Sequence, residues 1–322
     1  MDTNSLEINK QKINKYSSFE KAKFPFVYLL IAFPVLQMAI FWFYVQISGI
    51  SLAFLDESGS LSFAAFKDAI DVFGGRSSFG FSVPQMLAKS VFIWISTHVV
   101  LNIIAILSTF ILTRHMIGSK FFRVCYIIPG LLGAVVFVAI MQEFYADDGI
   151  LVALSQKIGI KLPFEIIREG FLGNESTAFP TLMVQMYIWG LAGGGLILSG
   201  AYMRIPNEIY ESANLDGCGF FREAFQIAIP CVWPTISTMM IFSLCSIFTA
   251  DFSMYLYSNG TGARGMNSIG FYNYFLQVKI ANGDTSLYSY ASAFGLCLTV
   301  ITLPLVFLGR WILSKMNEIV EF

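Results

Sequence analysis

The chain has 322 residues, of which 56% are hydrophobic and only 13% are charged, and its formal net charge is −1. Soluble globular domains carry about 25% charged residues, so this composition excludes a disordered chain, a nucleic-acid-binding protein and almost any soluble enzyme. The nearly balanced charge points to no charged partner, and the mean hydropathy of +0.67 indicates a membrane protein.

Long uncharged stretches follow one another along the chain and predict six membrane-spanning helices. A helix rises about 1.5 Å per residue, so about 20 apolar residues cross a hydrocarbon layer of about 30 Å. The predicted spans are residues 25–47, 91–113, 123–143, 181–203, 231–250 and 288–310. The short uncharged segment 265–278 contains several amides and is predicted as an interfacial or extracytoplasmic helix instead of a seventh span. The sequence therefore predicts an all-α polytopic membrane protein.

Lysine and arginine residues beside the spans indicate the orientation. With the N-terminus in the cytoplasm, the inner segments carry a net positive charge and the outer segments a net negative charge. Membrane proteins favour this arrangement, so both termini are predicted to be cytoplasmic. Residues 1–24 are predicted as a cytoplasmic tail and residues 25–322 as the six-span domain. The first apolar run is too long for a cleavable signal peptide, and no small-residue cleavage site follows it.

The inner loop between the fourth and fifth spans, residues 204–230, is long and patterned. Pro206 suits the first position of a helix, and Glu208 places a negative charge in the first turn. Asp216 and Gly217 end the helix, because glycine adopts a positive φ without strain. The loop is predicted to form a short helix, a sharp turn and a second short helix that leads through Pro230 into the fifth span. An amphipathic loop on the bilayer surface is the alternative.

This loop resembles the EAA loop of ABC importer permeases. The family pattern is Glu-Ala-Ala, three residues, Gly, nine residues and Ile-x-Leu-Pro, and it is matched here by Glu211, Ser212, Ala213, Gly217, Ile227, Ile229 and Pro230. Ser212 and Ile229 depart from the pattern by small or isosteric changes. Arg123, Tyr126 and Pro129 are similar to the family's Arg-x-x-Tyr-x-x-Pro run, and residues 259–262 to its Asn-Gly-Gly-Pro turn without the final proline. The resemblance covers about residues 90–310 and implies the type I ABC importer permease architecture.

The resemblance implies a role for the loop and a set of partners. The helix at 206–217 is expected to dock into a cytoplasmic ATPase subunit, with Glu211 as the charged contact and Gly217 as the turn that lets the helix protrude. The residues expected to couple to the ATPase are Glu211, Ser212, Ala213, Asp216, Gly217, Ile227 and Pro230. The expected partners are two ATP-binding subunits, a second permease that makes a heterodimer, membrane lipid and an extracytoplasmic sugar-binding lipoprotein, all at a bacterial inner membrane.

The resemblance also points to a subfamily. Ile205-Pro206, Tyr210 and Leu215-Asp216-Gly217 are similar to the carbohydrate-uptake permeases. A sugar or oligosaccharide is therefore the expected substrate. A permease for a non-sugar solute stays an alternative within the same family.

The chain itself is expected to be a transport subunit and not an enzyme. It contains no Gly-Lys dipeptide and hence no phosphate-binding loop, so ATP and magnesium are expected in the partner ATPase and no cofactor in this chain. His98 and His115 have no Cys or His at ligand spacing, which leaves no candidate catalytic or metal site. A polytopic membrane enzyme would need such a cluster.

Uncharged polar residues in two spans are the candidates for the substrate path. Gln185, Tyr187, Trp189 and Gly190 lie at mid-depth in the fourth span, and Ser243, Ser246 and Thr249 lie along the fifth. Such groups suit a sugar, which needs hydrogen bonds and a flat apolar surface. Serines in spans also hydrogen-bond to their own backbone or join helices, and the pocket of a heterodimer can lie in the sibling subunit.

A secondary carrier or facilitator is the remaining alternative. Proton- and sodium-coupled carriers commonly place an ionisable group near the centre of a span. None of the predicted spans has Asp, Glu, Lys or Arg there, which argues against a carrier.

Overall fold

The computed structural model describes residues 27–56, 59–75, 79–114, 118–249, 251–262 and 265–320. The predicted N-terminal tail, residues 1–24, lies outside this part of the chain. The described elements are helices, with a single isolated bridge between Leu55 and Leu61. Residues 27–37 are helical and lead directly into the first of the elements named next. In chain order they are η1 (Met38–Phe43), α2 (Tyr44–Leu52), α3 (Ala64–Phe73), α4 (Val83–Trp94), η2 (Ile95–Val100), α5 (Leu101–Arg114), α6 (Ser119–Leu131), α7 (Ala134–Tyr145), α8 (Ile150–Ile158), α9 (Phe164–Gly173), α10 (Glu175–Tyr202), α11 (Asn207–Leu215), α12 (Phe220–Arg222), η3 (Glu223–Ala228), α13 (Ile229–Cys245), α14 (Phe252–Tyr257), α15 (Ile269–Ala281) and α16 (Leu287–Val320), where η marks a π-helix.

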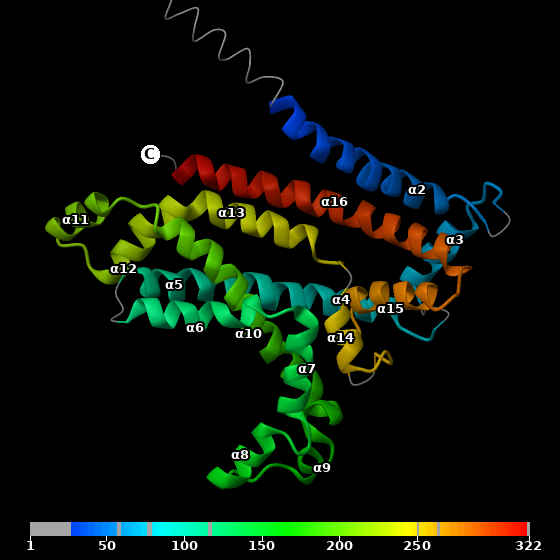
Figure 1. Ribbon diagram of the computed structural model, residues 1–322, viewed down its shortest axis with the longest axis horizontal. Coiled ribbons are helices and arrows are strands. Elements are labelled where there is room, and N and C mark those ends of the chain that lie inside the picture. Colours follow the sequence, from blue (N-terminus) through cyan, green and yellow to red (C-terminus); the bar gives the residue numbers. More distant parts are fainter. Residues whose placement is uncertain are drawn as a thin grey trace, which may run out of the picture.

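Most of the long helices run side by side along one direction (Figure 1). The short helix α11 and the C-terminal end of α16 lie at one end of this bundle, and α3 lies at the other (Figure 1). The described part of the chain is therefore all-α, as the uncharged stretches predict.

Within the described ranges, five helical segments are long and apolar enough to cross a membrane. They are Val27–Leu52, Val83–Arg114, Ser176–Tyr202, Phe220–Cys245 and Leu287–Met316, and they overlap the predicted first, second, fourth, fifth and sixth spans. The second span begins at Val83 instead of at residue 91. The prediction began after the charged residue Lys89, whereas the helix includes it. The ammonium of Lys89 donates hydrogen bonds to the carbonyl oxygen of Gly265 at 3.1 Å and to Oδ1 of Asn267 at 2.5 Å, two acceptors on the segment that precedes α15.

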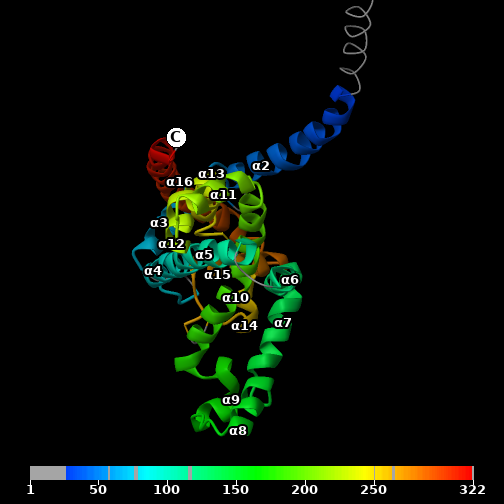
Figure 2. The same ribbon diagram turned by 90° about the vertical axis from the view of Figure 1, so that its left-hand side faces the viewer.

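The predicted third span, residues 123–143, is not one straight helix. The chain turns by 100° between Ser119–Leu131 and Ala134–Ile158. Leu132 and Gly133 have extended ψ angles of 138° and 137°, which interrupt the helical hydrogen bonds. Pro129 in the last turn of α6 lacks a backbone N–H and favours the break. The helices α7, α8 and α9 project to one side of the bundle (Figures 1 and 2), and the bundle has six spans when this bent pair is counted as one.

Small residues let α10 approach its neighbours α5, α6 and α13 closely. A Cβ atom added at Gly195 would lie only 1.9 Å from Cε1 of Tyr126 on α6, and one at Gly190 would lie 2.8 Å from Cδ1 of Leu101 on α5. Close van der Waals packing of this kind holds helices together in a membrane, where no hydrophobic effect acts between them. Helix α10 is the central element of the bundle.

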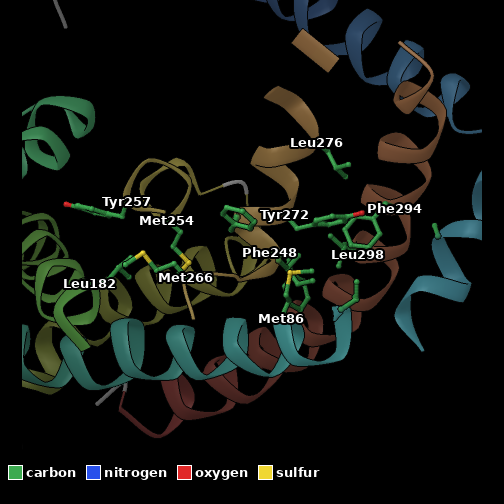
Figure 3. Packing of buried hydrophobic residues seen from close by; sticks show 14 of the residues in the cluster. Met86, Leu182, Phe248, Met254, Tyr257, Met266, Tyr272, Leu276, Phe294 and Leu298 are labelled. Atoms are coloured by element: carbon green, nitrogen blue, oxygen red, sulfur yellow. The ribbon is translucent and has the colours of Figure 1, made fainter. Parts of the chain in front are cut away.

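Two clusters of buried apolar residues occupy the two ends of the bundle. The cluster at the α3 end brings together spans two, four and six with α14 and α15, and it includes Met86, Leu182, Phe248, Met254, Met266, Tyr272, Phe294 and Leu298 (Figure 3). The cluster at the α11 end includes Ala105, Phe110, Leu198, Tyr202, Tyr210, Ala224, Val232 and Ile236. The predicted non-spanning segment 265–278 lies at the α3 end, where it forms the short, largely buried helix α15.

Candidate functional site

The loop between the fourth and fifth spans forms the predicted helix, turn and helix. Helix α11 begins after Pro206 and ends at Leu215. Gly217 then adopts a φ of +71°. Its N–H donates to the carbonyl of Asn214 at 3.1 Å, and the N–H of Cys218 donates to the carbonyl of Ala213 at 3.0 Å. These two hydrogen bonds form a Schellman motif, which caps the helix at its C-terminal end.

Helix α11 has one exposed side and one buried side. Glu211, Ser212, Asp216 and Gly217 are exposed. Tyr210 and Ala213 are three residues apart, and both are buried against the bundle. Leu215 is 90% exposed, and Ile209 of the same helix is 41% exposed, so α11 presents apolar as well as polar side chains on its exposed surface.

The remaining residues of the predicted coupling set lie closer to the bundle. Ile227 is part of η3 and Pro230 is the second residue of α13, and both are half-buried. They join the protruding loop to the fifth span.

An ion pair fixes the loop to the second span. The Nε atom of Arg114, the last residue of α5, lies 3.0 Å from Oε1 of Glu223 at the start of η3. The guanidinium carbon of Arg114 lies 3.7 Å from the centre of the Tyr210 ring. Glu223 is 3% exposed and Tyr210 is also 3% exposed. Burial raises the pKa of Tyr210 to about 12, although the positive charge of Arg114 acts in the opposite direction, so this tyrosine remains a neutral phenol.

Aromatic rings support this junction from the membrane side. The ring centres of Phe110 and Tyr202 are 5.9 Å apart, and those of Phe110 and Phe220 are 5.6 Å apart. Phe110 of α5 therefore packs against α10 and against α12 of the loop. In the sequence, Arg114 is one of the basic residues beside the spans that indicate the orientation of the chain. The sequence alone does not predict that Arg114 contacts Tyr210 or Glu223. The interval of 109 residues between Arg114 and Glu223 gives no local pattern that would reveal the pair.

A cavity of about 740 Å³ opens between the second, fourth and fifth spans and the segment that follows the fifth. Six of the seven candidate substrate-path residues line it, namely Gln185, Trp189, Gly190, Ser243, Ser246 and Thr249. Tyr187 does not line the cavity. The second span adds residues that the sequence analysis did not propose for this role, among them Ser90, Trp94, Thr97, His98 and Asn102. The feature of the sequence that could have identified these residues is the presence of polar side chains within an otherwise apolar span.

Gln185 brings a buried hydrogen-bonding atom without a partner to the cavity wall. The residue is 4% exposed, and its Oε1 atom has no hydrogen-bond partner in the structure. An unsatisfied buried acceptor costs about 1–3 kcal/mol. This oxygen is therefore prepared to accept a hydrogen bond from a hydroxyl group that enters the cavity.

The two candidate serines make local hydrogen bonds. Oγ of Ser243 donates to the carbonyl of Met240 at 2.8 Å, and Oγ of Ser246 donates to the carbonyl of Ser243 at 2.9 Å. The indole N–H of Trp94 donates to the same Ser243 carbonyl at 2.9 Å. These contacts fix the cavity wall, and each hydroxyl oxygen keeps its lone pairs for a ligand.

Trp94 and Trp189 present aromatic rings to the cavity from two different spans. The ring of Trp189 packs edge to face on Phe137, with centres 4.7 Å apart. Apolar walls with a few fixed polar atoms are typical of small-molecule sites, which commonly enclose about 300–1,000 Å³.

The cavity wall contains one carboxyl group, that of Asp251. Asp251 caps the N-terminus of α14, where its carboxylate accepts a hydrogen bond from the backbone N–H of Ser253 at 2.9 Å. Burial raises the pKa of this carboxyl group, and the hydrogen bonds from Ser253 and Met254 act in the opposite direction. Among the lining residues there is no lysine or arginine, and His98 is the one basic side chain. Within the described ranges, no three His, Cys, Asp or Glu side chains gather to hold a metal ion.

Comparisons with known proteins place this geometry in context. No protein-family model matches the chain. The chain is similar to the diacetylchitobiose uptake system permease protein NgcF of Streptomyces coelicolor, with 27% identity over 201 residues, which are 61% of this chain and 54% of that protein. It is also similar to Protein LplB of Bacillus subtilis, with 27% identity over 300 residues, which are 91% of this chain and 89% of that protein.

The fold is that of a solved transporter. A chain of a bacterial alginate ABC transporter, crystallised in complex with an alginate pentasaccharide-bound periplasmic protein, superposes with a TM-score of 0.74. The superposition covers 92% of this chain and 97% of that chain at 18% identity. The all-α, multi-pass architecture is therefore that of an ABC importer subunit.

Proposed function

We propose that the chain is a permease subunit of an ABC importer and that it moves a sugar or oligosaccharide from an extracytoplasmic binding protein into the cytoplasm, on the strength of its similarity to sugar-uptake permeases. The observation that carries the proposal is that the protruding helix α11 and the cavity are built on the same helices. The loop 204–230 connects α10 to α13, and both helices line the cavity.

The connections of α11 to α10 and α13 allow α11 to act as a lever on the cavity wall. A force on α11 reaches α10 through the four residues 203–206 and reaches α13 through the short segments α12 and η3. Packed helices move as units between discrete arrangements instead of deforming continuously. Closure of a soluble ATPase on α11 would therefore shift both helices of the cavity wall.

The energy source lies in other subunits. Since the chain has no phosphate-binding loop, two ATP-binding subunits would supply ATP and magnesium. Glu211 and Leu215 on the exposed side of α11 are the charged and the apolar contact for one of them. We place the assembly in a bacterial inner membrane, with the loop 204–230 and both termini in the cytoplasm.

A second permease would complete the membrane part. In the first span, Val27–Leu52, none of the side chains in its most apolar window is buried against the described chain. Lipid or a sibling subunit covers such a surface, and the importer architecture calls for a sibling. We propose a heterodimer, as in the related sugar systems that the sequence resembles.

The cavity favours a neutral saccharide. Oε1 of Gln185 offers an acceptor to a sugar hydroxyl, and Trp94 and Trp189 offer flat apolar surfaces. The acidic side chain of Asp251 and the lack of lysine or arginine among the lining residues disfavour an anionic sugar, because a buried charge needs a partner of opposite sign. In this respect the cavity differs from what a polyanion such as alginate would require.

The test is to purify the tagged full chain from its native membranes in mild detergent and to identify the co-purifying proteins by mass spectrometry. We expect an ATP-binding subunit and a second multi-pass permease. The complex, reconstituted in liposomes with its binding protein, should take up a neutral oligosaccharide only when ATP is supplied. Recovery of the chain alone, active in transport without ATP, would overturn the proposal in favour of a carrier.

A further inference from the structure

We propose that Arg114 is a positioning residue that couples helix α11 directly to the cavity wall of the second span. This inference rests on the proposed function, since it assigns a path to the movement of α11. It adds a third, non-covalent connection to the two that the chain itself provides through α10 and α13.

The contacts of Arg114 bring three elements together. The residue ends α5, its Nε atom lies 3.0 Å from Oε1 of Glu223 on η3, and its guanidinium carbon lies 3.7 Å from the centre of the Tyr210 ring on α11. The side chain of Glu223 is 4% exposed and that of Arg114 is 24% exposed. The ion pair is thus mostly shielded from water. Charge interactions in such a shielded position are stronger than at an exposed surface.

The geometry requires arginine at this position. A planar guanidinium donates a hydrogen bond from its edge to a carboxylate while its face lies on an aromatic ring. Arg114 makes both contacts at once. The compact ammonium of lysine carries the same charge but lacks the flat, extended group that spans both partners.

The second span continues from this junction into the cavity. Arg114 ends a helix that begins at Val83, and Thr97, His98 and Asn102 of the same helix line the cavity. A displacement of α11 that moves Tyr210 therefore acts on Arg114 and on the helix behind it. In this way the second, fourth and fifth spans, which all contribute residues to the cavity wall, are connected to α11.

The test compares variants of the complete importer, purified with its ATP-binding subunits and reconstituted in liposomes. Arg114→Gln removes the cation, and Arg114→Lys keeps the cation but removes the planar group. Arg222→Gln is the matched control, because Arg222 is an exposed neighbour of Glu223 whose Nε donates to Oε1 of Gln226 at 2.8 Å. The readouts are the amount of assembled complex, the rate of ATP hydrolysis and the number of substrate molecules imported per ATP hydrolysed.

We expect the Arg114→Gln complex to hydrolyse ATP at a rate within about twofold of the wild type but to import at least fivefold fewer substrate molecules per ATP. Arg114→Lys should fall between the two, and Arg222→Gln should match the wild type. The effects of Arg114→Gln and Glu223→Gln should be less than additive when combined, because both changes remove the contact between these two residues. A purely structural role would lower the amount of complex and leave the ratio of substrate to ATP unchanged.

Two results would overturn the inference. One is an unchanged import ratio in assembled Arg114→Gln complexes. If that variant does not accumulate, an Arg114→Lys complex with the wild-type ratio has the same consequence. A wild-type complex that lacks an ATP-binding subunit would instead contradict the proposed function, so the two failures are distinguishable.

Discussion

At the scale of single residues, the side chain of Gln185 is unfavourable for stability but suited to binding a ligand. Its Oε1 atom is buried in the cavity wall without a hydrogen-bond partner, which a membrane protein retains at a cost. An apolar side chain of similar size would remove that cost. The unsatisfied acceptor therefore indicates selection for a ligand contact.

We expect Gln185→Leu to lower uptake while leaving the thermal stability of the complex equal or higher. Loss of one hydrogen bond to substrate corresponds to about 0.5–1.5 kcal/mol, or roughly a two- to tenfold change in affinity. Substrate-dependent uptake kinetics and a thermal unfolding curve measure the two effects. Ser243→Ala is the control within the same cavity, and its effect should be smaller because that hydroxyl donates to its own helix. Unchanged uptake by the Gln185→Leu variant would remove Gln185 from the substrate path.

Glu211 is the residue whose loss should separate transport from assembly of the membrane domain. It is exposed on α11, so Glu211→Ala should abolish uptake with a near-normal amount of protein in the membrane. A charge-assisted hydrogen bond of about 1.5–3 kcal/mol to the ATPase would be lost.

Glu208→Ala is the matched control for Glu211, since Glu208 is an exposed carboxylate in the first turn of the same helix. Uptake assays on whole cells and immunoblots of isolated membranes give the two readouts. Equal uptake by the Glu211→Ala variant and the wild type would show that Glu211 has no coupling role.

Glycine is required at position 217 because of the backbone conformation there, and not because a side chain would clash with its neighbours. Its φ is +71°, and a Cβ atom at this position would meet nothing within 4 Å. A residue with a Cβ atom pays roughly 1–2 kcal/mol in this left-handed conformation. Gly217→Ala should therefore weaken the end of α11 and lower uptake, whereas Gly217→Asn should be better tolerated because asparagine enters this conformation more readily. Uptake per unit of membrane protein measures both, and equal effects of the two substitutions would contradict this explanation.

At the scale of elements, α10 shows how glycines on one helix serve different purposes. Gly195 faces the ring of Tyr126 at a distance that admits no Cβ atom, while Gly193 has nothing within 4 Å. The glycine-rich sequence 190–200 predicts close packing in general. It does not indicate which glycines make the contact, because that depends on the rotation of α10 against α6.

Gly195→Val should separate α6 from α10 and reduce the amount of folded protein, whereas Gly193→Val should be tolerated. Overpacking of a well-packed interface typically costs about 1–3 kcal/mol. Thermal unfolding of the purified complex, followed by size-exclusion chromatography, compares the two variants. A Gly195→Val complex as stable as the Gly193→Val complex would show that α6 and α10 are not packed as described.

The limits of the sequence prediction also lie at this scale. Five spans and the helix–turn–helix of the loop follow from uncharged runs and from Pro206, Glu208 and Gly217. The bend after α6 does not, because Pro129 is also compatible with a continuous span in a membrane protein. The Arg114–Glu223 pair could not be predicted from the sequence either, since only the fold brings these two residues, 109 positions apart, next to each other.

At the scale of the whole molecule, the two ends of the bundle should face opposite sides of the membrane. Asn214 lies at the end of α11, and Thr285 lies between α15 and α16 at the other end, and both are exposed. In a chain whose own cysteines have been replaced, Thr285→Cys should react with a membrane-impermeant maleimide on intact spheroplasts. Asn214→Cys should react only after the membrane is opened. The reverse pattern would invert the orientation, and reaction of both sites on intact spheroplasts would exclude a membrane between them.

The first span, Val27–Leu52, has a consequence for how the protein is made. It diverges from the rest of the bundle at its beginning (Figure 2), and none of the side chains in its most apolar window is buried by the described chain. Its entry into the bilayer therefore depends on its own apolar length and not on the later helices. During synthesis this segment is membrane-inserted before α10, the central packing element, has left the ribosome. The chain is thus anchored before it folds, and the assembly of the remaining helices takes place already confined to the plane of the membrane.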